Sequence, residues 1–501
     1  MVKSIKIFIV ILFFITYAKF SLQAENKSLF FPLQGAVYEY FDFVLNRTND
    51  TTFRFPLQQP YDFSRVRLHS DHEKLVAKIS QINKLFVADA VNPFVRVGGK
   101  IIMDQGSPVY HEMDGGLSFT TESVTLFTQF SFHRQYKYDR KFAGNLSDAD
   151  HWIFGRFQEA YLHFHKNHWT FFIGRTNRNW GTLNEYSLIL SNNPYSYEHM
   201  YFSYEYKKLK YSMLFAQLDT RDELIFKHNA SDSIIPAPAS RRFFIAHRYA
   251  IMFSNNFQIA FTQAATYGGE NRQVELAFFN PMNPNFMLQH NERLENDGFL
   301  AISVFWKLKK GITLWGQFLG DDIVINNDPG IDAAALYPNR LGLQGAIKIS
   351  DILLNKSLWS FRYNRIWNRT YQSINTWENY HYREYSLGYP VASSEEFSLK
   401  FHLWRYFPLY VKAELNYGRY GNVSLTDYFP MKKEPFPVPK VAKNVIFNLS
   451  TKYFYSSRLQ FNTELTYRKN PNHYSNRFEE QNRWVVRIGF SYLLNKGFGV
   501  N

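Results

Sequence analysis

The stretch RWVVRIGFSYLL, residues 483–494, alternates between two kinds of side chain. One parity is apolar and aromatic: Trp484, Val486, Ile488, Phe490, Tyr492 and Leu494. The other parity includes Arg483, Arg487, Gly489 and Ser491. A period of two residues indicates a β-strand. Because arginine is costly to bury in a dry core but is solvated by a water-lined lumen, the pattern favours the wall of a transmembrane barrel.

The same alternation recurs upstream. In residues 458–468, one parity carries Leu459, Phe461, Thr463, Leu465 and Tyr467, and the other carries Arg458, Gln460, Asn462, Glu464, Thr466 and Arg468. From residue 93 onward the chain divides into such segments of about 8–12 residues, a length that crosses a bilayer when the strand is tilted. We therefore expect residues 93–501 to form an all-β, antiparallel transmembrane barrel.

The connections between these segments alternate between short and long. Short turns are expected at 166–167, 208–209, 254–256, 309–310, 350–356, 407–408 and 455–457. Long connections are expected at 136–154, 175–199, 219–242, 268–297, 321–339, 368–395, 419–442 and 469–482. Transmembrane barrels have short periplasmic turns and long outer loops, so this order predicts sixteen strands. A weaker hairpin, 93–102 with 107–117, would make eighteen.

Composition fits this fold class. The chain has 501 residues, a mean hydropathy of −0.35 and 19% aromatic residues. A chain that is polar on average but rich in aromatics is typical of alternating strands with aromatic girdles. The absence of cysteine excludes disulfides, thiolate chemistry and cysteine-bound metals.

The N-terminus predicts export. Lys3 and Lys6 precede the apolar run 7–18, and Ala24 is a candidate cleavage point, so residues 1–24 are expected to be a cleaved signal peptide rather than an uncleaved anchor. Removing residues 1–24 removes three lysines and lowers the net charge from +14 to +11. This positive charge could attract an anionic polymer, or it could contact the phosphates of outer-membrane lipid and lipopolysaccharide.

Residues 25–92 are expected to form a periplasmic segment. Residues 37–45 could be a short strand. Residues 70–86 predict a helix, because Ser70 and Glu73 match a capping box and apolar residues follow at helical spacing. This helix would pack against the end of the barrel, or alternatively dock a partner.

Catalytic, metal and nucleic-acid motifs are not recognised in the sequence. No phosphate-binding loop, zinc-protease helix or nucleophile elbow occurs, so we expect neither an enzyme nor a bound cofactor. His163, His165 and His168 have no neighbouring carboxylate and favour a solvated turn over a metal site. The acidic loop 321–332 lacks the EF-hand spacing, although its oxygen ligands would suit calcium.

Aromatic residues cluster in two of the expected outer loops. Loop 175–199 carries Trp180, Tyr186, Tyr195 and Tyr197, and loop 368–395 with the residue before it carries Trp367, Tyr371, Trp377, Tyr380, Tyr382 and Tyr385. Sugars present apolar C–H faces ringed by hydroxyl groups, so aromatic rings beside polar side chains suit a glycan site. The alternative is that these rings pack loop against loop above the barrel.

A family resemblance is carried by Phe172-Ile173-Gly174-Arg175, by Trp180-Gly181 and by the run 187–194, SLILSNNP. These motifs resemble the signature of the Wzi-type capsule-assembly proteins, as do the run from Asn280-Pro281 to Asn296-Asp297 and the motif Gly320-Asp321-Asp322. Thr182-Leu183 replaces the Pro-Gly usual in that family, so the turn of this loop differs. The resemblance implies an outer-membrane barrel with a periplasmic helical element that holds surface polysaccharide.

We therefore expect a monomeric barrel in the outer membrane of a Gram-negative bacterium that binds capsular or other surface polysaccharide. The candidate binding residues are Arg175, Arg178, Trp180, Asn184, Tyr186, Asp321, Trp377 and Tyr380. The alternative is a porin-like channel for anionic or sugar solutes, in which the lumen residues Arg362, Arg458 and Glu464 would set selectivity.

Overall fold

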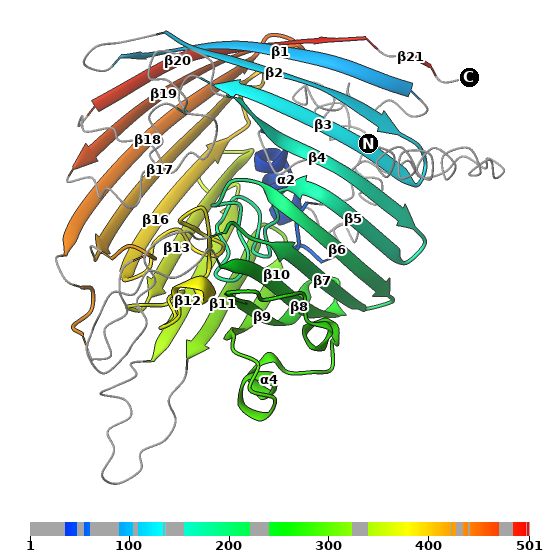
Figure 1. The fold of residues 1–501 in the computed structure, drawn as a ribbon. Coiled ribbons are helices and arrows are strands. Elements are labelled where there is room, and N and C mark those ends of the chain that lie inside the picture. Colours follow the sequence, from blue (N-terminus) through cyan, green and yellow to red (C-terminus); the bar gives the residue numbers. More distant parts are fainter. Residues whose placement is uncertain are drawn as a thin grey trace.

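The computed structural model describes residues 36–47, 55–60, 90–103, 109–133, 136, 155–220, 240–322, 339–421, 423–426, 434–438, 441–469, 484–496 and 498–499. Within these residues, eighteen long strands form one antiparallel sheet (Figure 1). They are β1 (Ala90–Met103), β2 (Val109–Thr120), β3 (Val124–His133), β4 (Gly155–Lys166), β5 (Trp169–Thr176), β6 (Tyr197–Tyr206), β7 (Leu209–Gln217), β8 (Arg241–Ser254), β9 (Phe257–Gly269), β10 (Asp297–Lys309), β11 (Ile312–Asp322), β12 (Arg340–Ser350), β13 (Ser357–Ile366), β16 (Ser394–Leu403), β17 (Leu409–Tyr420), β18 (Ala442–Phe454), β19 (Leu459–Lys469) and β20 (Trp484–Asn495).

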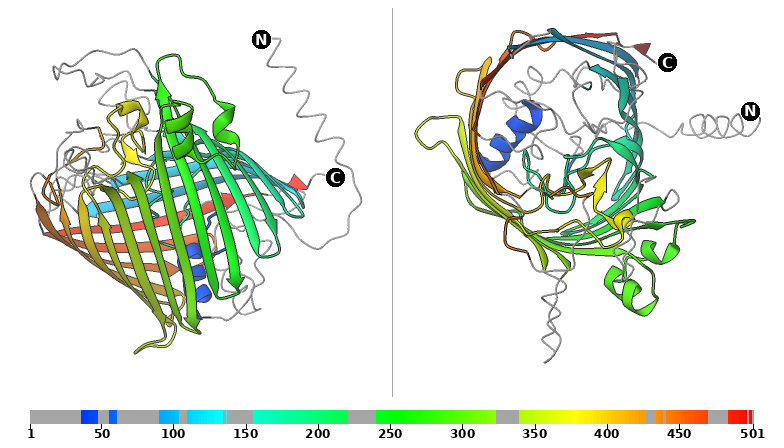
Figure 2. Two further views of the ribbon diagram at one scale, coloured as in Figure 1. Left: turned by 90° about the horizontal axis from the view of Figure 1, so that it is seen from below. Right: turned by 60° about the vertical axis from the view of Figure 1, so that its left-hand side comes forward.

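The sheet closes on itself. Each of these strands pairs with the next, and β1 pairs with β20 from Phe94↔Asn495 to Met103↔Val486. The predicted hairpin 93–102 with 107–117 is the β1–β2 pair, so the higher of the two predicted strand counts is correct. The closed wall is visible end-on in Figure 2.

The outer face of the wall is apolar. On β20, Trp484, Ile488, Phe490 and Leu494 are exposed, while Val485, Arg487 and Leu493 on the other parity are buried. Aromatic pairs lie near both strand ends: Trp169–Tyr204 (4.3 Å between ring centroids) close to the short turns, and Tyr467–Trp484 (4.7 Å) close to the opposite rim. An apolar belt between two aromatic girdles is the surface that a bilayer requires. None of the described helices has the length and apolarity to cross a membrane.

The connections have the predicted asymmetry. Short turns join β4 to β5, β6 to β7, β8 to β9, β10 to β11, β12 to β13, β16 to β17 and β18 to β19, as expected. The long connections therefore lie at the opposite rim. One of them carries η4 (Leu276–Phe279) and α4 (Asn285–Asn291), and another carries η5 (Thr376–Glu378) and the small ladder of β14 (His381–Tyr382) and β15 (Tyr385–Ser386).

The short strand expected at residues 37–45 is wrong. These residues belong to helix α2 (Ala36–Arg47), which lies inside the barrel (Figures 1 and 2). Its polar side chains Glu39, Asp42 and Asn46 recur at helical spacing and face the polar inner wall. Asp42 accepts two hydrogen bonds of 2.8 Å from Lys348 on β12.

Residues 55–60 also lie against the inner wall. Gln58 donates to the Tyr201 hydroxyl (3.0 Å), and Gln59 exchanges backbone hydrogen bonds with Asn179. The predicted signal peptide and the predicted helix 70–86 lie outside the described residues. The short β21 (Phe498–Gly499) pairs with the start of β1.

Candidate binding cavity

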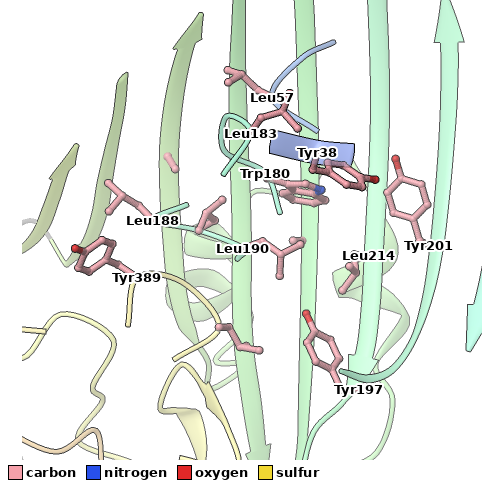
Figure 3. Close-up of a cluster of buried hydrophobic side chains, with 14 of the residues drawn as sticks. Tyr38, Leu57, Trp180, Leu183, Leu188, Leu190, Tyr197, Tyr201, Leu214 and Tyr389 are labelled. Atoms are coloured by element: carbon pink, nitrogen blue, oxygen red, sulfur yellow. The ribbon is translucent and has the colours of Figure 1, made fainter. Parts of the chain in front are cut away.

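The loop between β5 and β6 folds into the lumen. The described residues of this loop include Trp180, Leu183, Leu188 and Leu190, which are completely buried and pack with Tyr38 of α2 (Figure 3). Gln317 on β11 fixes the loop from the wall: its side chain donates to the Trp180 carbonyl (2.8 Å) and accepts from the Leu188 amide (2.8 Å). This loop is therefore part of the interior of the barrel.

The loop between β13 and β16 packs on top of the first. The Tyr371 hydroxyl donates to the Leu188 carbonyl (2.7 Å), the Tyr380 hydroxyl donates to the Ile189 carbonyl, and the Ser191 amide donates to the Leu387 carbonyl (2.7 Å). Gly388 lies so close that a Cβ there would overlap the Leu188 carbonyl oxygen. Together the two loops fill much of the lumen.

Of the four candidate aromatic residues, two are buried in this packing and two are partly exposed. Trp180 and Tyr380 are completely buried, and Tyr380 packs against Phe299 (4.3 Å) on β10. Their rings belong to the loop-to-loop core, which was the alternative reading of the aromatic clusters. Trp377 is partly buried and its carbonyl accepts a hydrogen bond from Arg242 (2.8 Å). Tyr186 is 38% exposed.

The charged and polar candidates do not converge on one point. Arg175 lies on the outer face of β5, in the same parity as the lipid-facing Ile173, and pairs with Glu198 (2.9 Å). Arg178 is buried against the Tyr201 ring and donates to His199 (2.8 Å). Asp321 is also buried.

The contacts of the remaining candidates show where each of them lies. Asp321 accepts a hydrogen bond from the Tyr371 amide (2.7 Å) and pairs with Arg340 (3.3 Å), so it fixes the β13–β16 loop. Asn184 donates to the Tyr38 carbonyl and to Asp42, both at 3.3 Å. Arg458 lies in the turn between β18 and β19, outside the strand, whereas Glu464 faces inward and pairs with Arg487 (3.0 Å).

A cavity of about 630 Å³ lies between these loops, α2 and the inner wall of β13 and β16–β18. Three predicted residues line it, namely Asn184, Tyr186 and Arg362. Its other lining residues are Tyr38, Glu39, Gln59, Asn179, Glu185, Asn192, Asn193, Glu384, Tyr385, Tyr389, Pro390, Val391, Glu396, Lys400, Lys412, Glu414, Asn416, Tyr420, Ile446 and Lys452. It extends from Glu396 and Tyr420, at the loop ends of their strands, to Lys412 and Lys452 near the short turns.

Ion pairs join the charged residues of the cavity in a chain. Arg362 pairs with Glu185 and with Glu396 (2.5 Å), and Lys400 pairs with Glu185 (2.9 Å). Lys400 and Lys412 both lie 3.9 Å from Glu414. Glu39 of α2 completes the chain, 3.6 Å from Lys412 and 2.9 Å from Lys452.

These pairs keep the loop and helix carboxylates ionised. Burial alone would raise the pKa of Glu39, but Lys452, Lys412 and His402 outweigh it and hold the pKa at about 2. Lys400 and Arg362 likewise overcome burial and hold the pKa of Glu185 well below its usual range. Asp42 differs, because its burial outweighs Lys348 and raises its pKa. Among the side chains that line the cavity, carboxylates and cations occur in nearly equal number.

Tyrosines supply the apolar surface of the cavity. The rings of Tyr186 and Tyr389 meet edge to face at 6.3 Å, and the Tyr389 hydroxyl donates to Glu396 (3.0 Å). The hydrogen bond fixes the buried Tyr389 ring, and Tyr186, which packs on it, keeps an exposed apolar face. The cavity therefore combines the aromatic face of Tyr186 with carboxylate, ammonium and amide groups.

Sequence reasoning missed the wall residues of this cavity. Glu396, Ser398, Lys400 and His402 occupy every second position of β16, and Lys412, Glu414 and Asn416 do the same on β17. This period-two polar face was the available signal for an inner wall. The sequence does not indicate which inward positions border empty space, because the filling loops come from elsewhere in the chain.

The model of the family described as capsule assembly protein Wzi matches residues 99–322, from β1 to β11. This part of the chain is similar to the Wzi family. The resemblance expected from the Trp180-Gly181 and SLILSNNP motifs is therefore confirmed.

A solved structure has a similar fold. The chain is similar to Wzi of Escherichia coli, described as an outer membrane protein involved in group 1 capsule assembly and as a carbohydrate-binding β-barrel. The two are 15% identical with a TM-score of 0.62, over 92% of this chain and 98% of that one. OccD3 (OpdP) of Pseudomonas aeruginosa is 10% identical over 81% of this chain and 91% of its own, with a TM-score of only 0.44. No curated protein matches the sequence.

Proposed function

We propose that this Wzi-type barrel is a non-enzymatic outer-membrane protein that holds capsular or other surface polysaccharide at the cell surface. The cavity beside β16–β18 is the proposed polymer site. We further propose that residues 1–24 direct export and are cleaved, and that the barrel works as a single chain, since β1 and β20 close it without a partner.

The observation that carries this proposal is the exposed Tyr186 ring beside closely spaced charged groups. The exposed ring of Tyr186 offers a face for the C–H surface of a sugar, and the buried Tyr389 beside it donates from its hydroxyl to Glu396. Sugar hydroxyls both donate and accept, so a lining of carboxylates and ammonium groups can satisfy both roles. The carbohydrate binding stated for the Escherichia coli protein supports the same ligand class.

The filled lumen argues against the channel alternative. Helix α2, residues 55–60 and the two inward loops occupy space that an open porin leaves to water. In planar bilayers we expect the protein to pass no steady current. A large, stable single-channel current together with an intact capsule in the deletion strain would support the porin instead.

Replacing Tyr186 by alanine tests the site. It removes one exposed ring without touching the ion pairs, and we expect affinity for the host's purified capsular polysaccharide to fall about tenfold, equivalent to about 1.4 kcal/mol. Tyr455→Ala is the matched control, because Tyr455 is 69% exposed in the turn between β18 and β19, far from the cavity lining. Equal affinities of Tyr186→Ala and the wild type would exclude Tyr186 from the site.

A further inference from the structure

The connection between β9 and β10 folds onto the outside of the barrel. We call residues 270–296 the outer-wall lobe. It carries η4 and α4; the right-hand view of Figure 2 places it outside the ring of strands, and the left-hand view places it at the rim of the long loops. The β5–β6 and β13–β16 loops, by contrast, fold into the lumen.

The lobe covers part of the wall that would otherwise face outward. Phe243 and Ile245 on β8 have the same parity as Ile251 and Phe253, which are exposed nearer the short turns. Phe243 and Ile245 are nevertheless buried, in one cluster with Phe278 and Leu288 of the lobe. Phe278 also stacks on Tyr267 of β9 with ring centroids 4.4 Å apart.

A tight turn, residues 280–283, forms the tip of the lobe that lies nearest the short turns. Asn280 holds it: its carbonyl accepts from the Asn283 amide (3.1 Å), and its side chain accepts from the Met282 amide (3.0 Å). The turn rests on the outer wall, where Tyr249 donates to the Pro281 carbonyl and Gln263 donates to the Asn283 carbonyl (3.2 Å). Met282 stands at the apex and is 80% exposed.

The register places this tip at the edge of the apolar belt. Tyr249 pairs with Phe261, and their rings are stacked at 6.5 Å. Phe261 in turn pairs with Ile302 on β10, and both side chains are exposed on the lipid-facing surface. The apex residue Met282 therefore continues the surface that already contacts lipid.

We propose that the outer-wall lobe is an interfacial anchor whose Met282, Leu276 and Met287 side chains enter the outer leaflet of the membrane. Leu276 is 82% exposed and Met287 is also exposed. Flexible apolar side chains that protrude at the level of the acyl-chain boundary are the usual means by which a surface element enters a leaflet. Continuity with the belt through Phe261 favours lipid over a protein partner as the occupant.

Spin labelling tests the anchor directly, because the chain has no cysteine and each variant introduces one thiol. Met282→Cys is labelled and reconstituted in phosphatidylcholine vesicles, and collisions with oxygen and with a water-soluble nickel chelate are compared. Ile302→Cys on the belt is the lipid control, and Glu292→Cys, exposed on the same lobe, is the water control. We expect the Met282 label to favour oxygen as the Ile302 label does.

Two results would overturn the anchor. One is a Met282 label that the nickel chelate reaches as readily as it reaches the Glu292 label. The other is a label that neither reagent reaches, which would mean that protein covers the tip. Leu276→Cys is the second variant, with the same expected oxygen preference, and only variants that keep the heat-dependent gel shift of a folded barrel are scored.

Discussion

Glu185 shows how single residues organise the cavity. It accepts from both Arg362 and Lys400, and its backbone segment comes from the β5–β6 loop. A buried carboxylate without partners would be costly, so the two cations of the wall fix the loop in one position. Glu185, Arg362 and Lys400 also line the cavity, and because they are paired the net charge of the lining is small. A neutral or weakly charged polymer suits such a lining better than a strongly anionic one.

Gly388 is a second decisive residue. An added Cβ would overlap the Leu188 carbonyl oxygen and approach the Tyr371 hydroxyl to 2.8 Å. Overpacking of this kind costs about 1–3 kcal/mol, so Gly388→Ala should speed amide exchange of residues 187–191 by about tenfold to a hundredfold. Gly115→Ala is the control, since its Cβ would meet nothing closer than 3.8 Å. Unchanged exchange in Gly388→Ala would contradict the tight contact of the two loops.

Glu39 makes the docking of α2 dependent on pH. Its folded pKa is about 2 against an ordinary value of 4.5, so its stabilisation is complete above pH 4.5 and is lost as the pH falls from 4.5 towards 2. The full contribution is at most about 3 kcal/mol. Thermal unfolding in detergent should therefore show a smaller loss between pH 6 and pH 3 for Glu39→Gln than for the wild type. Parallel losses in the two proteins would argue against this role of Glu39.

At the scale of elements, helix α2 is where sequence reasoning failed. Residues 37–45 are rich in aromatic and β-branched residues, a composition typical of strands. Tertiary contacts override this preference, because Glu39, Asp42 and Asn46 reach wall residues more than 250 positions away. The polar stripe at helical spacing was present in the sequence, but it faces the inner wall of the barrel rather than bulk water.

The α2 contacts predict a conductance change. Removing both anionic partners, in Glu39→Ala with Asp42→Ala, leaves Lys348, Lys412 and Lys452 without their helix carboxylates and should loosen α2 from the wall. Planar-bilayer recordings should then show open-channel events that the wild type lacks. Glu198→Ala, which breaks only the outer-face pair with Arg175, is the control. A silent double variant whose α2 has become sensitive to protease would show that the helix does not block the lumen.

The strands, in contrast, were predictable because their signal is local. Period-two alternation on β19 and β20 follows directly from one face in lipid and one in a polar lumen. The paths of the long loops were not predictable in this way. Trp180 is buried in a loop that Gln317, 137 residues away, binds through the Trp180 carbonyl, and no local pattern distinguishes such a ring from an exposed one.

At the scale of the whole molecule, three layers follow one another from outside to inside. An apolar outer face meets lipid, a closed sheet of eighteen strands satisfies its own backbone, and a core of inward loops and α2 occupies the lumen. Because the sheet has no free edge, the loops are not needed to stabilise it. They are thereby available to shape a cavity, and the β16–β18 wall supplies its charges.

Hydroxyl-radical footprinting with the host's capsular polysaccharide tests most directly whether the polymer occupies this cavity. Tyr186 is exposed within the cavity and Tyr455 is exposed in a short turn outside it, so both are oxidised in the free protein. With polysaccharide bound, the account predicts that oxidation of Tyr186 falls while that of Tyr455 stays the same. Bound polysaccharide that leaves the oxidation of Tyr186 unchanged would contradict it.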